Sequence, residues 1–174
     1  MKSHALAFAA ALALSALGAM TGAIAQADAP DLTTMANSAQ IQALIIKARK
    51  TIQPGHTILI EKIIGIEPFD ATLDYRSGPG GAGAHETDDE IFYVVEGTGT
   101  FVTGGHIVPA PGVNQANAAL PNHTIEGGHA RTITKGDLLM VPHNTPHQIL
   151  AVKGRDMAII EMRMPRPDMG TPRP

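Results

Sequence analysis

The sequence contains no cysteine and no tryptophan among its 174 residues, and it has only two tyrosines and four phenylalanines. Without cysteine, no disulfide framework can stabilise the fold, and no thiol can serve as a metal ligand or nucleophile. With so few aromatic rings, we do not expect a binding site built from stacking platforms. The net charge is -3 with no long basic run, which does not favour nucleic acid or an anionic membrane surface as a partner.

The stretch 1–25 predicts a secretory signal peptide. A lysine precedes an apolar run over residues 5–17, which is shorter than the ~20 residues that a membrane span needs. Small residues follow with the spacing that signal peptidase recognises, and they favour cleavage after Ala25 or Ala27. We therefore expect a periplasmic or secreted mature chain that has no membrane attachment once the peptide is removed.

The rest of the chain predicts one helix followed by an all-β domain. Residues 33–50 predict an amphipathic helix, because apolar residues recur at helical spacing at Ile41, Leu44, Ile45 and Ala48. Residues 55–164 form short β-rich segments bounded by glycine, proline, asparagine or aspartate, a pattern typical of a sandwich or barrel. Residues 165–174 contain four prolines and little to bury, so we expect a disordered tail.

Two short stretches predict hairpin turns between these strands, "EGTG" at 96–99 and "KGD" at 135–137. Between them, residues 104–129 are rich in glycine, proline and asparagine and predict a long loop. A loop of that length inside a compact domain is usually functional or mobile.

A histidine and four carboxylates stand at the mouth of one predicted strand, in the stretch "GAHETDDEIFYVVEG". Burying a charge costs several kcal/mol unless it is paired or bound to a cation, so these groups are either solvated or hold a metal. We interpret Glu86, Asp88 and Asp89 as solvated loop residues. Asp89 could alternatively accept a hydrogen bond from a metal-binding histidine.

Two blocks of the sequence, within residues 78–147, resemble the two motifs of the cupin superfamily. In the first, Glu90 precedes Gly97 by seven positions, and His85 precedes Glu90 by five. The family has a His-x-His pair before the glutamate, and this register places its first histidine at Gly83. The other register would make Thr87 the second histidine and leaves too short a spacing before Glu90.

In the second block, Gly136 precedes Pro142 by six positions, and His147 follows that proline by five. The family has glycine at the turn position that is Asn144 here. Asparagine tolerates a left-handed backbone better than other residues with a side chain, so the turn should still direct His147 inward.

The resemblance implies a fold and a metal site. The fold would be a single cupin (jelly-roll) β-barrel preceded by one helix, and the metal ligands would be His85, Glu90 and His147. Two imidazoles and one carboxylate are the donor set typical of Fe(II) centres with open positions, although Mn, Ni, Co or Zn would also fit. Glu90 is also the candidate catalytic residue, as a ligand or as a base.

The remaining polar residues keep alternative interpretations. His123 or His129 could fold over the barrel and replace the missing histidine, whereas His143 is expected to point to solvent. Tyr75 and Arg76 could reach a bound ligand or pack at the barrel edge.

Two functions remain open. One is a metal-dependent enzyme of the dioxygenase, isomerase or lyase type that acts on a small oxygen-rich organic molecule. The other is a non-catalytic module that binds a small molecule or a metal. The expected partners are a small-molecule substrate and a second copy of the chain in a homodimer, because dimerisation through an apolar sheet face is common in the family.

Overall fold

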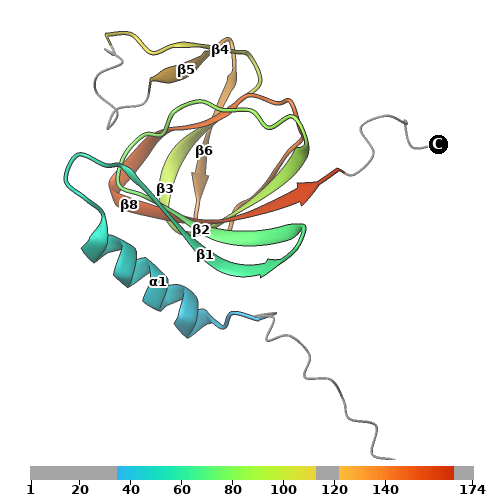
Figure 1. Ribbon diagram of the computed structural model, residues 1–174. Coiled ribbons are helices and arrows are strands. Elements are labelled where there is room, and N and C mark those ends of the chain that lie inside the picture. Colours follow the sequence, from blue (N-terminus) through green and yellow to red (C-terminus); the bar gives the residue numbers. More distant parts are fainter. Residues whose placement is uncertain (1–34, 113–121, 167–174) are drawn as a thin grey trace, which may run out of the picture. The chain divides into compact units, whose positions relative to one another are not determined.

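The computed structural model describes residues 35–112 and 122–166, which form one helix and eight strands (Figure 1). The predicted signal peptide, the tail from residue 167 and the middle of the predicted long loop lie outside the described residues. Within them, no helix is long and apolar enough to cross a membrane. The elements are α1 (Ser38–Thr51), β1 (Ile58–Ile66), β2 (Phe69–Arg76), β3 (Asp88–Thr103), β4 (His106–Pro109), β5 (His123–Glu126), β6 (His129–Thr134), β7 (Leu138–Val141) and β8 (His147–Pro165).

Helix α1 begins five residues later than the sequence predicted, because Asn37 caps it. The Asn37 side chain accepts a hydrogen bond from the backbone N–H of Gln40 at 3.0 Å, and the Gln40 side chain accepts one from the Asn37 N–H at 2.9 Å. This reciprocal capping satisfies two of the N–H groups that a helix start leaves unpaired. The predicted apolar face is confirmed, with Ile45 and Ala48 fully buried.

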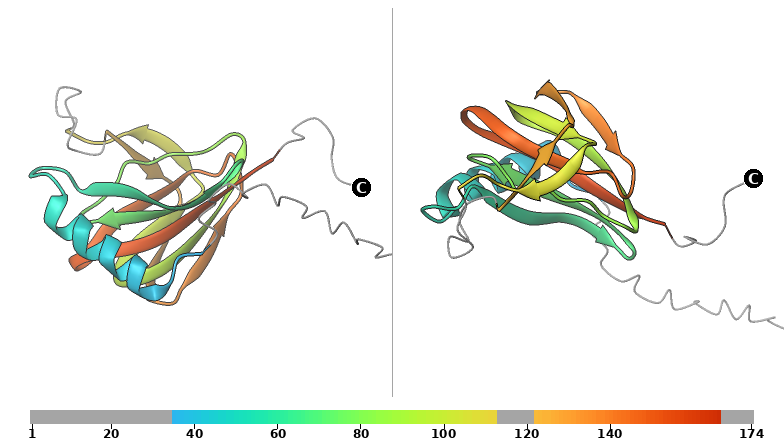
Figure 2. Two further views of the ribbon diagram at one scale, coloured as in Figure 1. Left: turned by 60° about the horizontal axis from the view of Figure 1, so that its bottom comes forward. Right: turned by 90° about the horizontal axis from the view of Figure 1, so that it is seen from above.

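The strands form a six-stranded antiparallel sheet in the order β1-β2-β8-β3-β6, in which β7 also pairs with β3. Strands β3 and β8 pair along almost their whole length, from Asp88 opposite Pro165 to Thr103 opposite His147. Three register shifts interrupt this pairing and bend the two strands, so that the sheet curls around its own interior (Figure 2). A separate two-stranded sheet joins β4 to β5, so part of the predicted long loop is a hairpin.

The predicted hairpin turn at "EGTG" is wrong, because β3 continues through it as one strand. Gly97 has a φ of 88°, which bends the strand without reversing it. A Cβ at this position would collide with the carbonyl oxygen of Asp156 and the Cα of Met157. The predicted turn at "KGD" is confirmed: it joins β6 to β7, and the Asp137 N–H donates to the carbonyl of Thr134 at 3.0 Å.

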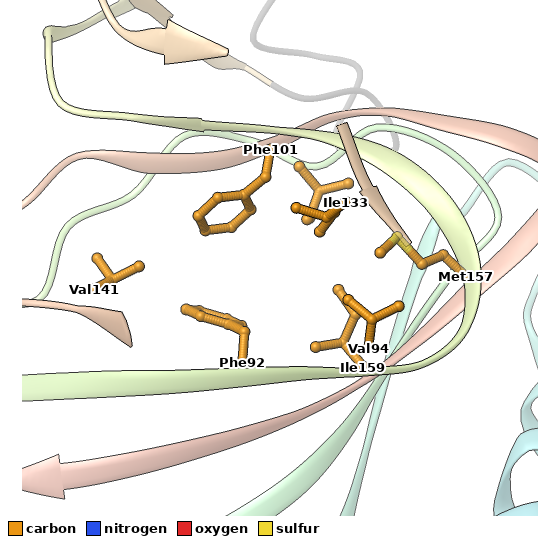
Figure 3. Close-up of a cluster of buried hydrophobic side chains, with 8 residues drawn as sticks. Phe92, Val94, Phe101, Ile133, Val141, Met157 and Ile159 are labelled. Carbon is orange, nitrogen blue, oxygen red and sulfur yellow. The ribbon is translucent and has the colours of Figure 1, made fainter. Parts of the chain in front are cut away.

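The main apolar core fills one end of the barrel interior (Figure 3). Phe92 and Phe101, both on β3, face each other across it with ring centroids 5.5 Å apart. The remaining members come from β3, β6, β7 and β8: Val94, Ile133, Val141, Ile149, Met157 and Ile159.

Helix α1 covers the outer face of the sheet, where its Ile45 packs with Leu73 and Ala158. Beside this cluster, the Arg49 guanidinium forms ion pairs with Asp156 and Glu96, and its Nε lies 2.7 Å from Asp156 Oδ2. The helix is therefore attached to the barrel by apolar packing and by a partly buried ion-pair cluster.

The outer sheet surface beyond the helix carries exposed apolar side chains, among them Phe69, which is 55% exposed, and Ile66. These residues border a shallow apolar groove with Ile64, Ile91 and Met162. Homodimerisation through an apolar sheet face stays a prediction.

Candidate metal centre

Two segments that lie more than 50 positions apart in the sequence meet at one end of the barrel interior. Glu90 is the third residue of β3, and the alternation of the strand points it to the same side as Phe92 and Val94. His147 is the first residue of β8. His85 precedes β3 on a segment whose Gly83 exchanges backbone hydrogen bonds with His147 at 2.9 and 3.1 Å.

The turn before β8 holds both histidines in place, whereas the sequence predicted this for His147 alone. Asn144 adopts a left-handed backbone with a φ of 56°, which confirms that asparagine takes the glycine position of this turn. The Asn144 N–H donates to the carbonyl of His85 at 2.7 Å, and this bond joins the turn to the segment that carries His85.

The three predicted ligands converge, with one donor atom from each lying within 4.8 Å of the others. The Nε2 atoms of His85 and His147 lie 3.2 Å from the Glu90 oxygens Oε1 and Oε2, respectively. His147 Nδ1 lies 3.1 Å from the carbonyl oxygen of Thr145. A proton on Nδ1 would be donated to that carbonyl, which leaves the Nε2 lone pair facing Glu90.

The carboxylate of Glu90 lacks the donors that a buried anion needs. Glu90 is 1% exposed, and its Oε1 receives no hydrogen bond from any described residue. The nearest guanidinium nitrogen is Arg163 Nε, at 3.6 Å. Two imidazole lone pairs and an unsatisfied carboxylate oxygen aimed at one point suit a divalent cation.

Burial determines the protonation of the three ligands in the metal-free chain. Burial, followed by the nearby charge of Glu161, raises the pKa of Glu90 to about 8. Burial also lowers the pKa of His85 and of His147, so both imidazoles are neutral at pH 7. Neutral imidazole is the form that binds metals, and a bound cation would favour the ionised form of Glu90.

Sequence reasoning missed several charged residues that lie beside the ligands. Glu161 and Arg163 alternate into the interior from β8, opposite Phe92 and Glu90 of β3. Asp74 lies inside β2 and is 0% exposed. The alternation in "LDYR" and "IEMRM" indicates that the charged residues of each segment share a face, but it does not indicate whether that face lies inside the barrel.

The structure also decides between the alternatives for the two residues that end β2. Arg76 forms part of the cavity wall beside the metal ligands. Tyr75 lies on the other face, where its hydroxyl donates to Asp156 at 3.0 Å. Of the two, Arg76 is therefore placed to reach a ligand.

The other predicted roles of histidine and aspartate need correction. His143 is not directed to solvent alone: its Nδ1 lies 3.1 Å from Asp89 Oδ1. Asp89 therefore contacts a histidine outside the metal cluster, and it orients none of the ligands. The rings of His123 and His129 are exposed, and within the described ranges neither joins the cluster of metal-capable residues.

Comparison with known proteins gives a fold rather than an activity. No family model and no curated protein matches the chain. Solved structures that it resembles include KdgF from Halomonas sp., at 22% identity over 68% of this chain and 86% of that one, with a TM-score of 0.43. Another is an RmlC-like cupin protein from Desulfovibrio desulfuricans, at 20% identity over 63% and 83% of the two chains, with a TM-score of 0.44.

A third is a cupin superfamily protein from Desulfitobacterium hafniense, at 13% identity over 68% of this chain and 87% of that one, with a TM-score of 0.45. The chain has the cupin fold. At such identities the likeness concerns the fold alone, so the activity of this protein has to be argued from its own residues.

Proposed function

We propose that this cupin is an enzyme that depends on a divalent transition metal and acts on a small oxygen-rich organic molecule. The observation that supports the proposal most is the unsatisfied Oε1 of the buried Glu90, which faces the imidazole of His85. His147 Nε2 lies 3.2 Å from the other oxygen of the same carboxylate. The donor set favours Fe(II), with Mn, Ni, Co or Zn as alternatives.

The three protein ligands would leave coordination positions for water and substrate, as a catalytic metal requires. When bound, the metal would supply a Lewis acid or a site for dioxygen activation, which suits dioxygenase-like, isomerase or lyase chemistry. The chain's own residues hold the site in place: Thr145 fixes His147 through its carbonyl, and the rings of Phe92 and Phe101 pack beside the ring of His147. Glu90 would act as a ligand or, if released, as a proton acceptor.

The proposed location is the periplasm or the cell exterior. The support for it is the signal-peptide pattern of residues 1–25. Detection of a shortened chain outside the cytoplasm by mass spectrometry would test it.

Elemental analysis tests the metal centre directly. The full chain, purified without chelator, is expected to hold one transition-metal ion, and His147→Ala should hold almost none. His143→Ala is the matched control, because His143 lies in the same turn but outside the ligand cluster. A wild-type chain that carries no more metal than His147→Ala would refute the centre.

Turnover separates the enzyme from the non-catalytic module. The iron-loaded chain should consume oxygen or convert members of a panel of small organic acids, sugars and phenols. A chain with one ion, ligand binding and no turnover with iron, manganese, nickel, cobalt or zinc would instead indicate the binding module.

A further inference from the structure

A cavity of about 220 Å³ lies beside the metal ligands. The volume is below the roughly 300–1,000 Å³ of typical ligand pockets, so the cavity suits a compound with few heavy atoms. Part of its wall is apolar and comes from Phe92, Phe101 and Ile149. The other part is charged and contains Arg76 and Arg163 in addition to the ligands. The occupant should therefore be small, partly apolar and complementary to that charge.

The two arginines share one arrangement, in which each contacts a carboxylate two residues earlier on its own strand. Arg76 donates from Nε and Nη2 to the same oxygen of Asp74, at 2.8 and 2.6 Å. Arg163 donates from Nε to Glu161 at 2.8 Å. In both residues one N–H edge of the guanidinium donates to the carboxylate, and the second N–H edge is left to bind another group.

The second N–H edge of each guanidinium has no strong hydrogen-bond acceptor within the described part of the chain. Arg76 Nη1 is buried and has no hydrogen-bond partner there. It lies against Gly80, where the absence of a side chain makes room for it. Arg163 Nη2 reaches only the Nε2 of His85, at 3.4 Å, and that lone pair is the one proposed to bind the metal. A guanidinium edge in a partly apolar cavity favours a planar, anionic acceptor.

The charge balance of the cavity points to the same kind of ligand. Asp74, Glu90 and Glu161 are three carboxylates against the guanidiniums of Arg76 and Arg163. When a divalent cation is bound and all five of these groups are ionised, the cation and the five groups together carry one net positive charge. A charge removed from water needs a partner, and a ligand with one negative charge would supply it.

We propose that this cavity binds a small organic acid with one negative charge, and that its carboxylate meets Arg163 with Arg76 as the second guanidinium of the wall. The inference rests on the proposed function, since the metal provides the surplus positive charge. Arg163 is then a substrate-binding residue, and Arg76 supplies the second positive charge of the cavity wall.

Isothermal titration of the zinc-loaded full chain tests this without any turnover. Lactate and pyruvate are each compared with their neutral amides, lactamide and pyruvamide. We expect at least one of the acids to bind about tenfold or more tightly than its amide, because charge-assisted hydrogen bonds are lost in the amide. Arg163→Gln should remove this preference, whereas Arg131→Gln should keep it, because Arg131 is an exposed arginine on β6, outside this cavity.

Zinc content, measured in every sample, separates the two possible failures. Arg163→Gln with one zinc ion and no preference for acids supports the proposal. If wild type holds zinc but binds acids no better than amides, this inference is wrong and the metal centre stands. If wild type holds no zinc, the titration is repeated with iron; a chain that holds neither metal refutes the proposed function, and this inference falls with it.

Arg76 requires a paired variant, because its removal alone would leave Asp74 buried without a partner. Asp74→Asn combined with Arg76→Gln removes both charges, so that neither partner is left buried and charged alone. It should weaken acid binding by about tenfold, because the second guanidinium is lost. If this folded double variant binds the acids as wild type does, Arg76 has no part in recognition.

Discussion

Replacement of Glu90 by glutamine should stabilise the metal-free protein while abolishing its metal binding. Burial raises the pKa of Glu90 from an ordinary 4.5 to about 8. Because the folded-state pKa lies above the unfolded value, ionisation opposes folding increasingly as the pH rises from about 4.5 to about 8. At 1.36 kcal/mol per pKa unit, the cost at pH 7 is about 3 kcal/mol.

Glutamine removes that cost and adds an NH2 group, which can donate to the imidazole nitrogen of His85 or of His147. The metal-free Glu90→Gln variant should therefore exceed wild type in its free energy of unfolding at about pH 8, with most of the gain gone near pH 5. Urea unfolding in the presence of chelator measures both values. Glu86→Gln is the matched control, because Glu86 is exposed on the approach segment and its replacement should change neither value.

Added zinc should reverse the order of stability at pH 7. A ligand at 1,000 times its dissociation constant stabilises the folded state by about 4 kcal/mol, which exceeds the cost of about 3 kcal/mol, and this gain should appear in wild type but not in Glu90→Gln. The reasoning is refuted if the metal-free variant is less stable than wild type at the higher pH, or if zinc stabilises both proteins equally.

Three further changes test the parts of the fold that support the site. Asp156→Asn should lower the free energy of unfolding by about 2 kcal/mol at pH 7, because the hydrogen bond from Arg49 lowers the pKa of Asp156 from 3.8 to about 2. That contribution is present above pH 3.8 and is lost as the pH falls through about 2, so urea unfolding of the two proteins should converge in acid. Asn144→Val should lower the free energy of unfolding by about 1–2 kcal/mol, because valine is strained in a left-handed backbone conformation. It should also weaken zinc binding, because the turn would no longer hold His85 through the bond to its carbonyl. Calorimetry measures both effects, and an unchanged zinc affinity would contradict this prediction. Gly97→Ala should cost about 3 kcal/mol by thermal unfolding, from its positive φ and its backbone collision, and a loss near zero would show that the bend in β3 has another cause.

The resemblance to the two cupin motifs made the metal ligands predictable. His85 and Glu90 stand at the motif intervals before Gly97, His147 stands at its interval after Pro142, and the structure brings the three together. Asn144 was predictable for the same reason, since few residues other than glycine adopt its backbone conformation.

The continuity of β3 could not be read from the sequence. A glycine between two apolar runs suits a hairpin turn and a bent strand equally well, and only the distant contact with Asp156 and Met157 decides between them. The start of α1 at Ser38 likewise depends on the capping geometry of Asn37, which competes with earlier polar residues of similar propensity.

The charged wall was hidden because both faces of the strands that form the barrel contain apolar residues. The segment "IIEMRM" places Glu161 and Arg163 on one face and Met162 on the other, and the sequence does not state which face is inside. Because charged residues are mostly exposed in folded proteins, the charged face would be assigned to solvent. The pairing of Arg163 with Glu90 across the sheet places it on the inner face instead, where its side chain is still 41% exposed.

Strands β3 and β8 supply both the apolar core and the charged residues of the site. The position of the charged residues along these strands determines where a metal can bind. Across β3 and β8, Val94 lies opposite Ile159, Phe92 opposite Glu161, and Glu90 opposite Arg163, so polarity rises toward the end of the barrel that holds the ligands. The Nε atom of Arg163 lies 2.8 Å from the Oε1 atom of Glu161 but 3.6 Å from the Oε1 atom of Glu90. Of these two facing carboxylates, Glu90 is thus the one whose cation is not supplied by the described chain, and it is also the one that the two imidazoles face. Without metal, burial keeps Glu90 largely protonated at pH 7, and a divalent cation taken from solution would be the partner that favours its ionised form.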